Sequence, residues 1–230
     1  MDRTRDLRFS LVAAHAITGV STRKRDGAGM KRILLAAACA LGVVSAGPSS
    51  AGEVFVGLYA HNVTFIGDNI GIGAVKREDG EDIHFGYRTD KISALWWLLK
   101  PQAYAFASIN DRGQSDFYAA GLAWPVSLFH SAFYIRPGIG LAYTDGETSL
   151  PPPAQPGLTP AQVQQRLNFN AHHLDFGDPV QFEPELALGY HISSHWSAEL
   201  SYTHISNGQI FHHGENEGLD DAGGRLIYKF

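Results

Sequence analysis

A histidine, a serine and an asparagine stand within four residues near the end of the chain, in His204-Ile205-Ser206-Asn207. A serine hydroxyl is a weak nucleophile unless a neighbouring base takes its proton, and histidine is the usual base. A carboxylate behind the imidazole fixes its tautomer and stabilises the imidazolium. The nearby candidates for this acid are Glu215, Glu217, Asp220 and Asp221. The pattern is therefore suited to nucleophilic ester chemistry.

The segment before these residues, "SAELSYTH", alternates polar and apolar residues as a strand does. Successive side chains of a strand point to opposite faces, so His204 and Ser206 share the apolar face with Leu200 and Tyr202. Asp220 has the parity of the apolar residues of the next segment, whereas Asp221 has the opposite parity. Parity thus favours Asp220 as the acid, with Glu217 and Asp221 as alternatives.

Asn207 and Gly208 directly follow the serine and could supply donors to an oxyanion. The simpler interpretation of the same residues is a rim at which His204 and Ser206 hydrogen-bond to each other or to lipid headgroups. Residue types alone do not separate these two interpretations.

Residues 30–51 read as a secretory signal, with the basic start Met30-Lys31-Arg32, an apolar run and a small-residue cleavage site ending at Ala51. Residues 1–29 are Arg-rich and patternless, and we expect them to be a non-native extension or a mis-assigned start. Residues 52–230 then form the functional domain. Cys39 lies within the signal, so we expect no disulfide or thiol chemistry in the mature part.

The mature part is a series of short alternating runs with a consistent apolar and aromatic face. Each run is close in length to the roughly 9–11 residues that a tilted strand needs to cross a membrane. We predict an all-β fold, an eight-stranded antiparallel transmembrane β-barrel of the outer membrane, with a secreted β-sandwich as the alternative. The predicted strands are 53–61, 82–89, 102–109, 115–124, 132–144, 180–190, 195–206 and 221–230.

Charge and composition exclude several other classes. From Gly52 onward the chain has 10 Lys and Arg against 20 Asp and Glu, a net charge of −10, which does not suit a nucleic-acid partner. The pairs His172-His173 and His212-His213 lack ligand spacing, and we expect solvated histidines and no metal site. Charged residues on the interior face are expected to form ion pairs: Arg136, Glu183, Glu185, Glu199, Arg225 and Lys229.

The His204-Ile205-Ser206-Asn207 stretch, the later Asn216-Glu217-Gly218-Leu219-Asp220 and the terminal aromatic Phe230 together resemble the PagL family of outer-membrane lipid A 3-O-deacylases. The resemblance is strong over about the last 30 residues. It implies a serine esterase that removes the 3-O-linked 3-hydroxyacyl chain from lipid A of lipopolysaccharide without a cofactor. Ser206 would be the nucleophile, His204 the base, Asp220 the acid and Asn207 an oxyanion residue.

The chain departs from the family pattern at three points. The acid is Asp220 where the family has Glu, the segment between Asn207 and Asn216 is slightly long, and Gln209 follows Gly208. The resemblance also implies a multi-pass outer-membrane protein whose active site faces the outer leaflet. Its expected partners are lipopolysaccharide and, during biogenesis, the outer-membrane insertion machinery.

Two rival functions fit the same barrel. One is a non-catalytic structural or adhesin barrel, because fold alone does not give function. The other is a lipase or acyltransferase barrel that acts on phospholipid. Deacylation, acyl transfer and no activity predict three different masses for lipid A.

Overall fold

The structure, a computed structural model, describes residues 52–65, 75–129, 131–210 and 213–230. All of them belong to one compact unit, Ala40–Phe230. The expected extension 1–29 and the expected signal 30–51, with Cys39, lie outside the described residues.

In these ranges, eight long antiparallel strands and one two-residue strand make up the sheet. The strands are β1 (Gly52–Ala60), β2 (Glu81–Thr89), β3 (Gln102–Asn110), β4 (Phe117–Ala123), β5 (Val126–Ser127), β6 (Phe133–Thr144), β7 (Val180–His191), β8 (Trp196–Ile205) and β9 (Leu219–Lys229).

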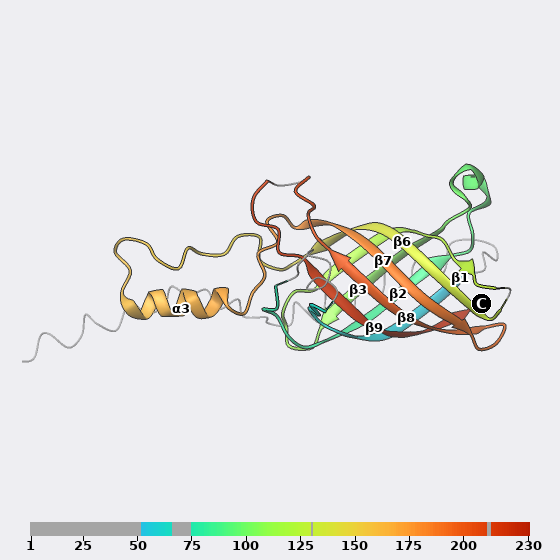
Figure 1. The fold of residues 1–230 in the computed structure, drawn as a ribbon, viewed down its shortest axis with the longest axis horizontal. Coiled ribbons are helices and arrows are strands. Elements are labelled where there is room, and N and C mark those ends of the chain that lie inside the picture. The colour runs from blue at the N-terminus through green and yellow to red at the C-terminus, as the bar shows by residue number, and fades with distance from the viewer. Residues whose placement is uncertain (1–51, 66–74, 130, 211–212) are drawn as a thin grey trace, which may run out of the picture. The chain divides into compact units, whose positions relative to one another are not determined.

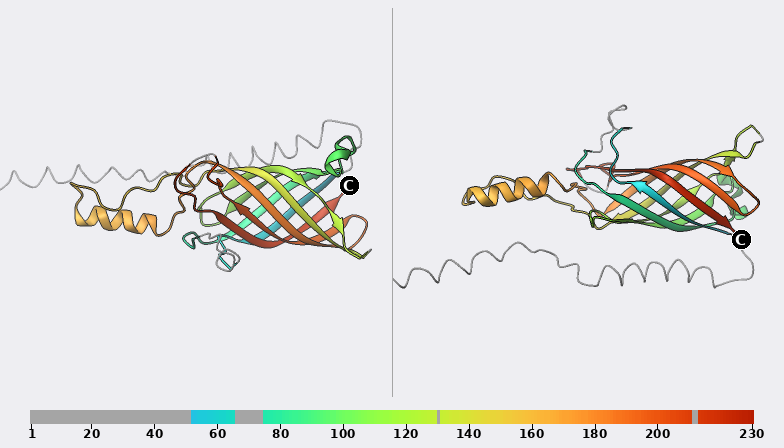
Figure 2. Two further views of the ribbon diagram at one scale, coloured as in Figure 1. Left: turned by 45° about the horizontal axis from the view of Figure 1, so that its top comes forward. Right: turned by 90° about the horizontal axis from the view of Figure 1, so that it is seen from below.

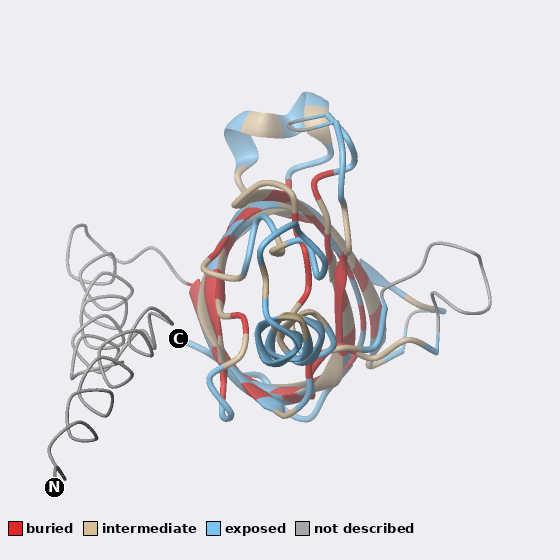
Figure 3. Cartoon of the chain, turned by 90° about the vertical axis from the view of Figure 1, so that its left-hand side faces the viewer, coloured by how far each residue is buried: buried red, intermediate tan, exposed pale blue. Residues whose placement is uncertain are grey.

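Two pairings close this sheet into a barrel. β1 pairs with β9, and β4 pairs with β6, while the short β5 only extends the edge of β6. Figure 1 shows the tilted strands from the side, and Figure 3 shows the closed ring along the barrel. Closure gives the backbone N–H and C=O groups of every strand a hydrogen-bond partner in a neighbouring strand. Strands can cross a bilayer only when this condition is met. The prediction of an eight-stranded antiparallel barrel is confirmed.

Exposure alternates along the strands as the parity prediction requires. In β1 the outward residues Val54, Val56 and Leu58 are exposed, whereas the inward Phe55 and Tyr59 are buried. The barrel therefore presents an apolar outer surface and encloses polar, charged and aromatic side chains. Soluble proteins show the opposite arrangement, with apolar residues inside and polar residues outside. An apolar exterior around a polar interior is typical of a membrane barrel.

Within the described residues, two helices lie in the connections, at opposite ends of the barrel (Figures 1 and 2). The 3-10 helix η1 (Ser93–Leu98) lies at the end that carries the C-terminus. Helix α3 (Pro160–Asn170) lies beyond the other end, and Thr159 caps it in a capping box with Gln162. No helix in the described residues is long and apolar enough to cross a membrane.

The chain after α3 returns to the barrel end and packs there. Leu174 and Phe176 are fully buried, and the Leu174 N–H donates to Glu78 at 3.1 Å. The Ser115 N–H and hydroxyl also donate to Glu78, at 3.2 and 3.1 Å. Glu78 thus ties together three connections at this end of the barrel.

Inside the barrel, arginines and glutamates form one continuous layer of ion pairs. This layer lies in the middle of the barrel and toward the end that carries the C-terminus. Arg88 and Arg136 both contact Glu53, and Arg225 contacts Glu185 and Glu199 at 2.6 Å. We call this set the arginine layer: Glu53, Arg88, Arg136, Glu185, Glu199 and Arg225. Interior ion pairing was predicted, but Glu53 and Arg88 were missed.

Two of the residues predicted to form interior ion pairs do not join the arginine layer. Glu183 accepts a hydrogen bond from Tyr104 rather than from an arginine. Lys229 lies at the exposed rim, where its Nζ is 3.4 Å from Asp90. Lys229 is the last residue of β9, so the long side chain reaches solvent instead of the interior.

Candidate active site

His204 and Ser206 lie on the outer face of the barrel, at the end of β8 from which the α3 connection extends. Both are partly exposed, whereas their neighbours Thr203, Ile205 and Asn207 are buried on the inner face. Ser206 follows the last residue of β8, and its backbone still pairs with Phe182 of β7 through two hydrogen bonds of 2.7 and 3.1 Å. The parity prediction for the two residues therefore agrees with their positions.

The imidazole of His204 lies between the serine and an aspartate. Its Nε2 is 2.9 Å from Ser206 Oγ, and its Nδ1 hydrogen-bonds to Asp220 Oδ1. His204 and Asp220 are direct partners across the β8–β9 pairing. With Nδ1 protonated toward the carboxylate, Nε2 is free to accept the serine proton, which is the tautomer that a general base needs.

Asp220 is only 1% exposed although its parity is outward. The His204 ring covers it, and the Tyr202 hydroxyl donates a hydrogen bond to its carboxylate. Tyr202 was not singled out from the sequence. Its place two residues before His204, on the same strand face, is the signal that could have identified it.

The two alternative acids have other partners. Glu217 pairs with Arg77 at 2.5 Å and accepts from the Asp175 N–H at 2.9 Å. Asp221 faces the interior, where His84 Nε2 is 3.1 Å from its carboxylate. Of Asp220, Glu217 and Asp221, Asp220 is the one that hydrogen-bonds to His204.

Asn207 stabilises the turn after the serine. Its side-chain amide donates to the carbonyls of Phe176 at 2.8 Å and Glu215 at 3.1 Å, and its Oδ1 accepts from the Gln209 N–H at 2.7 Å. Its own N–H donates to Asn216 Oδ1 at 2.9 Å. These bonds engage the Asn207 donors on the inner side of the turn.

Gly208 has a left-handed backbone with φ of +59°, which a glycine adopts without strain. Among the described residues its N–H has no hydrogen-bond acceptor. Of the two residues proposed from the sequence for the oxyanion, Gly208 is therefore the one with a free donor.

The segment before β9 covers the histidine. A Cβ atom added to Gly218 would lie 2.8 Å from Cε1 of His204 and 3.0 Å from the carbonyl of Ile205. Only a glycine allows the backbone to approach the imidazole this closely. Gly218 thus helps to hold the ring in the orientation that reaches both Ser206 and Asp220.

The family model for lipid A 3-O-deacylase (PagL) matches residues 81–229, more than half of the chain. The chain belongs to the PagL family. No curated protein sequence matches it.

Several solved structures are similar at low identity. The crystal structure of the outer membrane enzyme PagL is 12% identical with a TM-score of 0.44, and the match covers 79% of this chain and 99% of that chain. The N-terminal β-barrel domain of Pseudomonas aeruginosa OprF is 10% identical with a TM-score of 0.43, covering 79% and 100%. Neisserial surface protein A is 10% identical with a TM-score of 0.42, also covering 79% and 100%.

Proposed function

We propose that this PagL-family chain is a serine esterase of the outer membrane that removes the 3-O-linked 3-hydroxyacyl chain from lipid A. The observation that carries the proposal is the chain of hydrogen bonds from Ser206 through His204 to Asp220 on the outer face of the barrel. An ester of a membrane lipid reaches such a site from the bilayer, without entering the barrel.

Ser206 Oγ attacks the ester carbonyl while His204 Nε2 takes the hydroxyl proton. The tetrahedral oxyanion accepts a hydrogen bond from the Gly208 N–H, in a turn that Asn207 shapes. His204 then protonates the departing sugar oxygen, which leaves an acyl-enzyme. Water, deprotonated by the same imidazole, releases the hydroxy acid and restores the serine.

Asp220 keeps Nδ1 of His204 protonated and stabilises the imidazolium in both halves of the reaction. Tyr202 positions Asp220 through its hydroxyl. With both chain ends on the periplasmic side, the triad lies at the outer leaflet, level with the ester just below the sugar headgroup. No step requires a metal or an organic cofactor.

Mass spectrometry of lipid A tests this proposal. Cells with 3-O-acylated lipid A that produce the chain should lose the mass of one hydroxyacyl group. Ser206→Ala should lower the rate by roughly 10⁴-fold or more and leave lipid A intact, and Asp220→Asn should lower it by roughly 10⁴-fold.

A folded barrel runs differently on gels before and after heating, which verifies that each variant is inserted. Loss of the acyl group with Ser206→Ala would contradict the proposed nucleophile. A gain in lipid A mass would indicate acyl transfer, and unchanged lipid A with the unmodified chain would indicate a non-catalytic barrel.

A further inference from the structure

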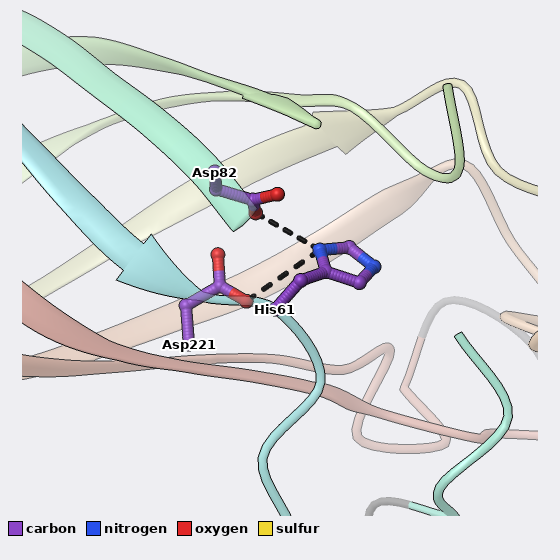
Figure 4. Close-up of side chains that lie close together, drawn as sticks. All are labelled: His61, Asp82 and Asp221. Atoms are coloured by element: carbon purple, nitrogen blue, oxygen red, sulfur yellow. Dashed lines mark hydrogen bonds and ion pairs between the residues drawn. The ribbon is translucent and has the colours of Figure 1, made fainter. Parts of the chain in front are cut away.

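Three buried side chains from distant parts of the sequence converge inside the barrel, at the end that carries the triad. They are His61, directly after β1, Asp82 in β2 and Asp221 in β9, and each is at most 1% exposed. Figure 4 shows both carboxylates directed at the same edge of the imidazole. We call them the His–Asp cluster.

The nitrogen and oxygen atoms of this cluster are close enough to share one ion. His61 Nδ1 is 2.9 Å from Asp82 Oδ2 and 3.8 Å from Asp221 Oδ1. All three potential ligand atoms lie within 4.8 Å of one another.

The charge of the cluster is not balanced by a permanent cation. In the described part of the chain, no Lys or Arg forms an ion pair with Asp82, Asp221 or the adjoining Glu78. The carboxylates of Asp82 and Asp221 both face Nδ1 of His61. Two neighbouring carboxylates repel each other unless a proton or a metal ion lies between them.

The partners around the cluster resemble the outer contacts of a metal site. His61 Nε2 faces Glu78 Oε2 at 3.1 Å, so a carboxylate orients the imidazole and leaves Nδ1 for an ion. The Asn110 amide donates to the second oxygen of Asp82 at 2.9 Å. Glu78 is itself held by Ser115 and Leu174.

An unused polar group lies beside the cluster. Thr203 is the direct cross-strand partner of Asp221 and is 1% exposed on the same interior side. Its hydroxyl has no hydrogen-bond partner among the described residues. A buried hydroxyl is costly to leave without a partner, and a ligand water of a bound ion would satisfy it.

The geometry points to a binding site for one divalent metal ion with mixed nitrogen and oxygen ligands, held by His61, Asp82 and Asp221. Imidazole together with carboxylates suits Zn²⁺ better than Mg²⁺, which prefers oxygen ligands. Because Asp221 adjoins Asp220, the ion would tie β1, β2 and β9 together behind the triad. The role is structural, so it does not depend on the proposed hydrolysis.

Neighbouring aspartates on opposite faces of β9 provide a matched pair for the test. The full chain, folded in detergent and stripped by a chelator, is dialysed against Zn²⁺ and its metal is counted. We expect about one more Zn²⁺ per chain in the unmodified protein and in Asp220→Asn than in Asp221→Asn. Asp221→Asn and His61→Gln should weaken this binding by roughly tenfold or more.

Equal Zn²⁺ binding by the unmodified protein and Asp221→Asn would overturn the site, as would displacement of the ion by equimolar Mg²⁺. Binding measured on the unmodified chain does not depend on a variant that folds, so absence of Zn²⁺ there would also overturn it. Asp220→Asn separates the two proposals, because it should abolish lipid A hydrolysis and leave metal binding intact.

Discussion

The two polar regions inside the barrel balance their charges in different ways. In the arginine layer each of the three carboxylates lies no more than 3.0 Å from an arginine. At the triad end, three buried carboxylates surround one histidine, and no Lys or Arg of the described residues pairs with them. The first region is balanced by permanent charges, whereas the proposed ion would balance the second.

Removal of the Arg225 guanidinium from the arginine layer should have the largest effect on the free energy of unfolding. Arg225→Met leaves Glu185 and Glu199 without their closest partner, so the free energy of unfolding should fall by about 3–5 kcal/mol. Urea unfolding in lipid vesicles measures this loss. Arg112→Met, at an exposed position, is the control and should change little; a loss as small in Arg225→Met would contradict the ion-pair account.

Substitution of Glu78, whose carboxylate joins the connections, should have the second largest effect on the free energy of unfolding. Glu78 accepts hydrogen bonds from His61, Leu174 and Ser115 on both of its oxygens. The amide of Glu78→Gln would set an N–H against some of these donors, so we expect a loss of about 1–3 kcal/mol in the same unfolding assay.

The matched substitution is Glu81→Gln, whose side chain is exposed. If the two variants unfold at the same urea concentration, Glu78 does not hold the connections together.

The smallest effect should come from Asp221→Asn in metal-stripped protein. Asp221 forms only long hydrogen bonds, of 3.1 to 3.4 Å. The unfolding free energy should stay within about 1 kcal/mol of the unmodified value. A loss of the size expected for Arg225→Met would mean that the two regions do not differ.

Added Zn²⁺ should increase the difference in stability between the unmodified chain and Asp221→Asn. Binding to the folded state alone stabilises a protein by mass action, so the melting temperature of the unmodified chain should rise with Zn²⁺ concentration. Asp221→Asn should show no such rise.

Much of the barrel follows from alternation, because burial on one face imposes a period of two on every strand. The eight predicted strands match the observed ones within about two residues at most ends. The same parity placed Asp220 outward and Asp221 inward, and placed His204 and Ser206 on one face.

Contacts that depend on the register between distant strands could not be predicted. Glu53 and Arg88 join the arginine layer because they are direct partners across the β1–β2 pairing, a register that no short motif encodes. The His–Asp cluster likewise draws on residues 61, 82 and 221, which have no ligand spacing in the sequence. The engagement of Asn207 by Phe176 depends on how the long connection returns to the barrel.

The opposite directions of Asp220 and Asp221 restrict how this protein can change in length. The connection between β8 and β9 can gain or lose residues only between Gly208 and Glu215, because Asn207, Asn216 and Gly218 hold its two ends beside the triad. An insertion or deletion of a single residue within β9 itself would exchange the two aspartates, sending the acid of the triad inward and the interior ligand toward lipid. Active proteins descended from this one should therefore differ in length in the connection. Within β9 they should differ only by an even number of residues.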